Sequence, residues 1–174
     1  MDNGKIRWID LDLPDVIDLR RKYITESSRR QFISKSVFDK SWYDEIKDKD
    51  RLMFIIAGVL YYFCENEIKG LFSDFYKIFK QGGVEIVFDY CSNRGLKISN
   101  KRVIEKGGFD KSAGLKWGID DIYRLEKWPL SHIKILEDMP MFREYKQNFP
   151  FYKRMGMNII DSLKIMSLAH IKIG

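Results

Sequence analysis

The chain has 174 residues and a mass of 20.7 kDa, and 45% of the residues are hydrophobic and 32% charged. This length and composition suit one packed domain and argue against a disordered chain. The longest apolar run, 52–64, is shorter than the roughly 20 residues of a membrane-spanning helix, so we expect no membrane partner. The formal net charge is +6, but the 31 basic residues are scattered among 25 acids, which disfavours nucleic acid as a partner.

The start of the chain and its two cysteines favour a cytoplasmic protein. A secretory signal has an apolar segment behind a basic start, and residues 1–12 contain no such segment. Cys64 and Cys91 have no metal-ligand spacing around them, so the simplest interpretation is two buried free thiols in a reducing compartment. No metal site is expected.

The first half of the chain alternates strand and helix patterns. Residues 6–13 are β-prone, and Pro14 stands where a helix would begin, with Asp12 as its cap. That helix ends before Ser27, and a short strand at 31–37 and a short helix at 42–46 follow. The run 52–57 is apolar throughout, which predicts a strand buried on both faces of a parallel sheet.

The second half continues the alternation. Helical spacing of apolar residues predicts a helix over 66–80 with Asn66 as its cap, and a glycine turn then leads to a buried strand over 84–88 that ends at Asp89. The glycine-punctuated region 92–128, with helices at 100–105 and 119–128, is interpreted as an insertion that covers a site. A strand at 132–136, a helix at 159–165 and a strand at 167–173 complete the chain. The sum is an α/β domain with a mostly parallel sheet, whose ligand binds beyond the carboxyl ends of the strands.

Four stretches carry a family resemblance. They are IDLDLPDVIDLR at 9–20, the segment 36–42, GVLYYF at 58–63, and residues 83–89 with the later KWGI at 116–119. In this order and spacing they resemble the leucine carboxyl methyltransferase superfamily, and within it the bacterial branch similar to the tetracenomycin polyketide O-methyltransferase. The resemblance implies one Rossmann-like, class I S-adenosylmethionine-dependent methyltransferase domain over 1–174. It also implies S-adenosylmethionine as methyl donor and a carboxylate or hydroxyl of a small molecule, such as a polyketide, as acceptor.

The resemblance further implies which residues bind the methyl donor. They are Asp10, Ser36, Val37, Phe38, Ala57 and Gly58. Asp10 would end its strand and take both ribose hydroxyls, because a carboxylate offers two acceptor oxygens; the alternative is that it caps the following helix. Residues 36–38 would lie beside the adenine, with the Ser36 hydroxyl or Asp39 in place of the acid that relatives have there. Ala57 also departs from the family, which has an acid at that position.

The acceptor side is assigned in the same way. Tyr61 and Tyr62 would pack against the methionine part or the acceptor, with a place in the core as the alternative. A carboxylate acceptor needs no base, but a hydroxyl acceptor benefits from one, and Asp89 is the candidate. Its alternative is a turn or helix-cap acid.

The glycine-rich turn that follows the first strand of such enzymes has no match in this sequence. The resemblance therefore implies an N-terminally truncated domain, with a strand missing between those predicted at 6–13 and 52–57. Three explanations stay open: a fragment of a longer protein, a frameshift product whose upstream half is separate, and a domain that closes its sheet by pairing across a homo-oligomer. Two functions stay open: an O-methyltransferase, whose activity in this chain alone is uncertain, and a non-catalytic, oligomeric remnant of the fold that has lost cofactor binding.

Overall fold

The computed structural model describes residues 4–49, 51–79, 82–102, 107–108, 110, 114–129 and 132–174. Its contacts divide the chain into two compact units, Met1–Asp48 and Lys49–Gly174. The single domain expected from the sequence stays a prediction.

The first unit is a two-stranded parallel sheet with one connecting helix. Strand β1 (Trp8–Asp12) pairs with β2 (Arg30–Ser34), and α1 (Pro14–Arg21) joins them. The 3-10 helix η1 (Lys40–Glu45) follows. Pro14 occupies the first turn of α1 as predicted, but the cap is Leu13 and not Asp12. The Asp12 carboxylate instead accepts a hydrogen bond from the Leu13 amide at 2.9 Å. The core of this unit consists of Ile17, Phe32, Ile33, Trp42, Tyr43 and Ile46.

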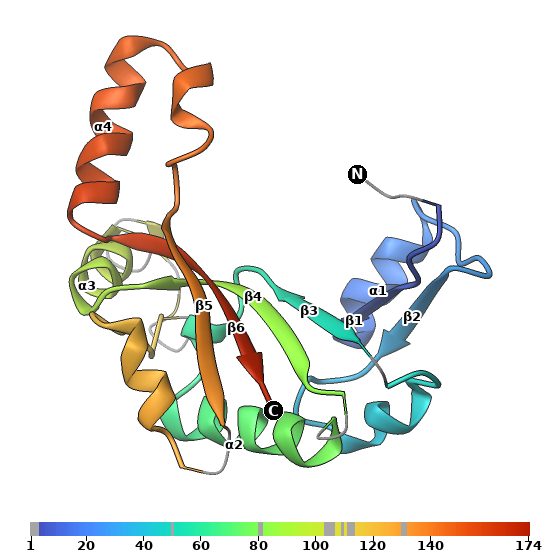
Figure 1. Cartoon of the computed structure of the whole chain (residues 1–174). Helices are drawn as coiled ribbons and strands as arrows, with labels where there is room; N and C mark the ends of the chain where they lie inside the picture. Colours follow the sequence, from blue (N-terminus) through green and yellow to red (C-terminus); the bar gives the residue numbers. More distant parts are fainter. Residues whose placement is uncertain are drawn as a thin grey trace. The chain divides into compact units, whose positions relative to one another are not determined.

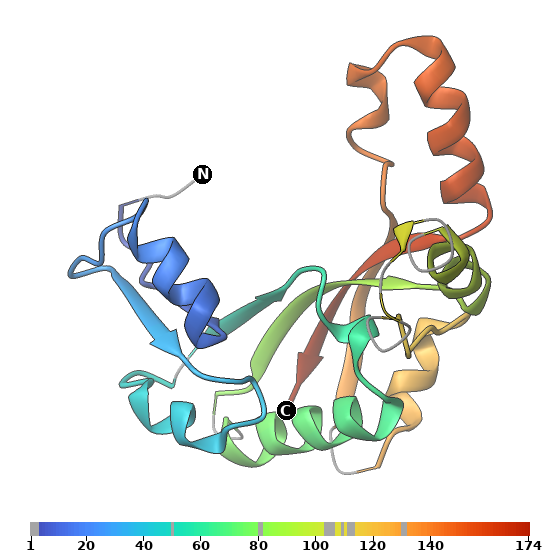
Figure 2. The same cartoon turned by 180° about the vertical axis from the view of Figure 1, so that it is seen from behind.

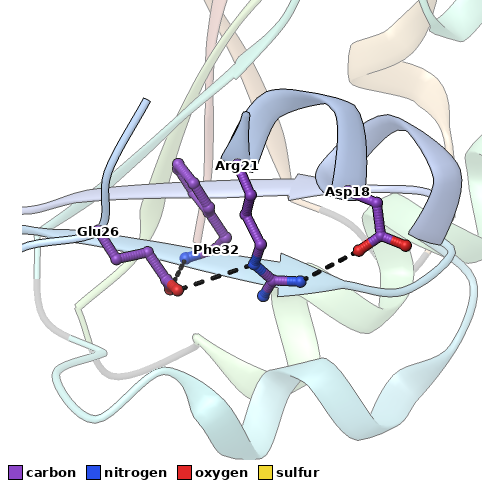
Figure 3. Close-up of polar contacts among 4 residues, drawn as sticks. All are labelled: Asp18, Arg21, Glu26 and Phe32. Atoms are coloured by element: carbon purple, nitrogen blue, oxygen red, sulfur yellow. Dashed lines mark hydrogen bonds and ion pairs between the residues drawn. The ribbon is translucent and has the colours of Figure 1, made fainter. Parts of the chain in front are cut away.

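The connection from α1 to β2 is held by one carboxylate (Figure 3). Glu26 accepts a hydrogen bond from the Phe32 amide at 2.8 Å, and its other oxygen lies 3.9 Å from Arg21 Nε. Arg21 Nη1 in turn lies 3.4 Å from Asp18 Oδ1. The carboxylate therefore links the end of the helix to the second strand of the sheet.

The second unit contains a four-stranded mixed sheet in the order β3-β4-β6-β5 (Figures 1 and 2). Its strands are β3 (Leu52–Ile56), β4 (Val84–Cys91), β5 (Ile133–Pro140) and β6 (Met166–Ile173). Strands β3 and β4 are parallel, and β6 runs antiparallel to both β4 and β5. Among the described strands, β1 pairs only with β2 and β3 only with β4, so no described pairing joins the two sheets.

Helix α2 (Glu65–Ile78) connects β3 to β4 and supplies the main apolar face of the second unit. Its buried residues Ile68, Leu71, Phe72 and Phe75 follow the predicted helical spacing. The N-cap residue is Cys64, two residues before the expected cap, Asn66. The Cys64 amide donates to Glu67 Oε2 at 2.7 Å, which satisfies a backbone group that the helix leaves without a partner.

Two strand predictions need correction. Strand β4 does not end at Asp89 but continues to Cys91, since Asp89, Tyr90 and Cys91 are paired with β6. Strand β3 is not buried on both faces: the side chains of Met53 and Ile55 are 54% and 61% exposed. A continuous apolar run does not by itself distinguish these cases, because burial depends on what covers each face.

Three further helices differ from their predicted positions. Helix α3 (Asn93–Asn100) begins earlier than expected because Ser92 caps it, accepting a hydrogen bond from the Gly95 amide at 3.1 Å. Half of the predicted helix 100–105, residues 103–105, lies outside the described residues. The expected helix 119–128 is a 3-10 helix, η5 (Ile122–Lys127), capped by Asp121. Helix α4 (Phe151–Ser162) is longer than the predicted 159–165 and follows the 3-10 helix η6 (Lys146–Asn148) between β5 and β6.

No helix in the described part of the chain is long and apolar enough to cross a membrane.

Candidate functional site

The carboxyl ends of β3 and β4 are joined by a hydrogen bond between a carboxylate and a loop amide. Gly58 follows β3 with a φ of +71°, a left-handed conformation that glycine adopts without steric cost. Its amide donates to Asp89 Oδ1 at 2.6 Å. Asp89 is only 6% exposed and stands within β4. These contacts make Asp89 the acid that fixes the β3 loop, and its catalytic role stays a prediction.

Tyr61 stands beside this pair, in the 3-10 helix η2 (Leu60–Tyr62) that follows the Gly58 turn. A Cβ added to Gly58 would lie 3.3 Å from the Tyr61 hydroxyl oxygen. Burial, together with the charge of Asp89, raises the pKa of Tyr61 to about 12. The hydroxyl is therefore a neutral hydrogen-bond donor at neutral pH. The structure thus brings three of the predicted residues together: Gly58, Tyr61 and Asp89.

The other two predicted residues of this loop lie at the surface. Ala57 is exposed, and Tyr62 is exposed with its ring centroid 5.1 Å from that of Tyr61. Neither side chain lies in the core, so the alternative of a core role does not describe Tyr62.

The predicted insertion packs against this edge through its backbone. The Tyr61 carbonyl accepts hydrogen bonds from the Lys116 and Trp117 amides at 2.7 and 3.1 Å. The Ile119 amide donates to the Cys91 carbonyl at 2.8 Å. Residues 116–119, which carried part of the family resemblance, therefore link the β3 loop to the end of β4.

Trp117 is a residue whose role the sequence did not indicate. It is buried, and its ring centroid lies 6.4 Å from that of Trp128, which is 6.1 Å from Phe72 of α2. Its indole Nε1 has no hydrogen-bond acceptor within the described residues, which is unusual for a buried polar atom. Only its place within the family-like KWGI stretch set this tryptophan apart in the sequence.

In the first unit, Asp10 does not end its strand. Strand β1 continues to Asp12, and Asp10 Oδ2 lies 3.4 Å from Arg20 Nη1 of α1. Asp10 therefore ties the helix to the strand through an ion pair, and its role at the ribose stays a prediction. Asp12, which the sequence assigned to the helix cap, occupies the carboxyl end of the strand instead. Asp10 and Asp12 are two residues apart in the strand, so both side chains lie on one face of β1.

The adenine-side candidates follow β2 in a tight turn. The Ser36 hydroxyl oxygen accepts a hydrogen bond from the Phe38 amide at 3.3 Å, and the Val37 carbonyl accepts one from Trp42 Nε1 at 3.0 Å. Asp39 caps η1 and accepts from both the amide and the hydroxyl of Ser41. The ring of Phe38 is exposed. Of these residues, Phe38 presents a flat apolar surface, and the Ser36 and Asp39 oxygens serve the local turn.

The cysteine prediction holds for one thiol only. Cys91 is buried, and desolvation followed by the charge of Asp89 raises its pKa to about 11. Cys64 is exposed, since it caps α2 at the surface, so the expectation of a second buried thiol is wrong. The described residues include no group of three or more histidines, cysteines or acids able to hold a metal ion.

Comparison with known proteins gives one relative by sequence. A 62-residue stretch is 31% identical to the Tetracenomycin polyketide synthesis O-methyltransferase TcmP of Streptomyces glaucescens, and it covers 36% of this chain and 23% of that relative. The chain thus matches about a quarter of the length of this curated relative. No family model matches the chain.

Solved structures resemble nearly the whole chain. A methyltransferase candidate from Thermobifida fusca gives a TM-score of 0.65 at 12% identity, over 98% of this chain and 64% of its own. A DUF574 family protein from Streptomyces avermitilis gives 0.61 at 9% identity, over 98% and 76%. PKMT2 from Rickettsia typhi, solved in complex with AdoHcy, gives 0.58 at 11% identity, over 97% and 44%. These matches confirm the predicted fold class, and the 62-residue sequence match confirms the predicted resemblance to the tetracenomycin polyketide O-methyltransferase.

Proposed function

The chain has the fold of the class I S-adenosylmethionine-dependent methyltransferases, and on that premise we propose that it is an O-methyltransferase, or part of one, acting on a carboxylate or hydroxyl of a small molecule such as a polyketide. The observation that carries the proposal is the 31% identity over 62 residues to an O-methyltransferase of polyketide synthesis. A likeness in fold alone would leave the acceptor atom open.

The residues of the first unit fit the adenosyl part of the methyl donor. Asp12 stands at the carboxyl end of β1, and one of its carboxylate oxygens accepts the Leu13 amide. The Asp10 carboxylate already forms an ion pair with Arg20. We therefore assign the ribose hydroxyls first to Asp12 and second to Asp10, and the adenine face to the exposed ring of Phe38. No glycine-rich turn for the carboxypropyl group occurs in the described sequence ranges.

S-adenosylmethionine supplies a methyl carbon activated by a sulfonium, so the chain's task is to align the acceptor oxygen with that carbon. In the transfer, a C–O bond forms as the C–S bond breaks, and a hydroxyl acceptor must also lose a proton. Tyr61 suits positioning rather than proton removal, because a tyrosine hydroxyl is neutral at neutral pH and its raised pKa makes the phenolate still less accessible. Asp89 is the proposed proton acceptor, with one oxygen already engaged by the Gly58 amide.

Isothermal titration of the full chain with S-adenosylmethionine and S-adenosylhomocysteine tests this proposal. We expect binding that Asp12→Asn weakens about tenfold or more, because a charge-assisted hydrogen bond to a ribose hydroxyl is lost. Asp10→Asn is the matched comparison, and a larger loss there would reverse the assignment of the two acids. If no heat appears with either ligand and the chain self-associates, the non-catalytic remnant is the correct description.

A further inference from the structure

The second unit carries an exposed apolar surface on the segment between β5 and β6, apart from the site described above. Residues 141–165, here called the arm, contain η6 and α4 and connect the end of β5 to the start of β6. In Figure 1 the arm stands away from the sheet, in orange and red, and Figure 2 shows the same from behind. Helix α4 has no buried residue.

The arm is nevertheless held together by specific contacts. Asp161 Oδ1 accepts the Phe142 amide at 3.1 Å, so the helix is tied back to the segment that precedes it. Arg154 donates to the Phe149 and Gln147 carbonyls at 2.7 and 3.0 Å. At the base of the arm, Lys164 Nζ lies 3.7 Å from Asp138 of β5. These ties hold α4 in place with one face outward.

The outward face of α4 is apolar. Phe151, Met155 and Ile159 recur every four residues, which places them along one side of the helix, and Tyr152 lies beside them. The four side chains are between 54% and 75% exposed. Residues on the opposite side, Met157 and Ile160, are partly covered by contrast. A contiguous apolar stripe of this kind on the surface marks an interaction site.

The charges around the stripe indicate the kind of partner. The arm carries five basic residues, Arg143, Lys146, Lys153, Arg154 and Lys164, and two acids, Glu144 and Asp161. Both acids lie near arm cations, at 3.8 Å from Arg143 and from Lys146. Lys153 has no ion-pair partner among the described residues, and Arg154 contacts only neutral carbonyls. The first turn of α4 has no acid, so the positive end of the helix dipole adds to these cations.

We propose that the arm docks on an anionic lipid surface, with the apolar stripe of α4 in the acyl boundary and Lys153 and Arg154 at the headgroups. An amphipathic helix with aromatic residues on one face and cations on the other binds in this way. A second copy of the chain is a poorer match, because two arms with a surplus of three positive charges would face each other. This proposal departs from the expectation of no membrane partner, which was based only on the lack of a spanning segment; an interfacial helix binds a membrane without crossing it.

The test is co-sedimentation of the full chain with vesicles. One set contains equal parts of phosphatidylcholine and phosphatidylglycerol, and the other only phosphatidylcholine. We expect binding to the anionic set alone, declining as salt is added. The double variant Phe151→Ser with Met155→Ser should weaken binding about tenfold or more, because it removes the apolar area that inserts. Tyr23→Ser, which removes an exposed aromatic ring from the first unit, should leave binding unchanged.

A charge variant distinguishes binding through the arm from general attraction of the positively charged protein to anionic lipid. Lys153→Glu should weaken binding several-fold more than Lys47→Glu, a matched change at an exposed lysine of the first unit. Equal effects of the two would overturn the proposal, as would the absence of binding to anionic vesicles. Sedimentation of the protein without lipid completes the test. A dimer that the double serine variant abolishes would make the arm a contact between copies. Binding of S-adenosylmethionine is measured separately and does not depend on this outcome.

Discussion

At the scale of single residues, the geometry of the loop after β3 depends on the conformation of Gly58. With φ at +71°, an alanine there would be strained, and its Cβ would lie 3.3 Å from the Tyr61 hydroxyl oxygen. We expect Gly58→Ala to lower the free energy of unfolding by about 1–2 kcal/mol. Urea unfolding measures this loss of free energy of unfolding. Gly70→Ala in α2 is the control: no atom lies within 4 Å of its added Cβ, so it should stabilise by about 1 kcal/mol. A Gly58→Ala protein as stable as the parent would contradict the strained turn.

Two tyrosines at this end of the sheet make stability sensitive to alkaline pH. Burial raises the pKa of Tyr61 from its usual value near 10 to about 12, and burial with the Asp138 hydrogen bond at 2.6 Å also raises the pKa of Tyr90. A raised pKa means that the folded state disfavours the phenolate. The contribution of these two tyrosines is therefore complete below pH 10, where their side chains are also neutral in the unfolded chain, and is lost as pH rises through 10 toward 12.

The measurement is urea unfolding at a series of pH values from 8 to about 11, a window set by the tyrosine pKa values. Tyr61→Phe and Tyr90→Phe should each flatten the alkaline decline. Tyr145→Phe, at an exposed tyrosine of the arm, should leave its slope as it is. Identical slopes in all four proteins would show that other groups control the alkaline limb.

At the scale of elements, α2 carries the packing of the second unit. The Phe72 side chain is fully buried, and its ring centroid lies 6.1 Å from those of Phe88 and Trp128. Phe72→Ala should lower the free energy of unfolding by about 3–5 kcal/mol, since it leaves a cavity in the core. Phe151→Ala, on the exposed stripe of α4, makes the same chemical change and should alter stability by less than about 0.5 kcal/mol. Chemical denaturation compares them, and similar losses would mean that α4 is packed.

The contrast between these two helices shows what sequence patterns determine. The apolar residues of α2 repeat at helical spacing, and the structure confirms this helix with its bounds shifted by one or two residues. The first two turns of α4 escaped prediction because Pro150 and Gly156 interrupt the pattern and the aromatic pair at 151–152 favours a strand equally. The periodicity of apolar residues predicts whether a segment is a helix or a strand. Whether one of its faces is buried depends on what packs against that face, as the exposed Met53 and Ile55 of β3 also show.

The candidate site could be predicted from the sequence only in part. The sequence placed Gly58, Tyr61 and Asp89 at strand ends that parallel topology brings together. In the structure a 2.6 Å hydrogen bond joins Gly58 to Asp89, and the Tyr61 hydroxyl lies beside Gly58. The sequence assigned the ribose to Asp10 and the helix cap to Asp12; the cap assignment is wrong, and the ribose assignment stays a prediction. Both acids lie on the same face of β1, because side chains two residues apart in a strand point to the same side. The ion pair of Asp10 with Arg20 depends on how α1 returns over β1, which no local pattern encodes.

At the scale of the whole molecule, the two units should differ in stability. The first has a two-stranded sheet with five paired positions, and a sheet of two strands is marginal by itself. The second has four strands, and β4 alone pairs with β6 over eight positions.

Native-state hydrogen exchange on the full chain compares the two units directly. We expect the amides of β4 and β6 to exchange about a hundredfold more slowly than those of β1 and β2, because the smaller unit opens without unfolding the larger one. Phe72→Ala supplies the control, since it should accelerate exchange in β4 and leave β1 nearly unchanged. Equal protection in both sheets, with a common response to Phe72→Ala, would instead show that the chain unfolds as one cooperative domain, as its length alone suggests.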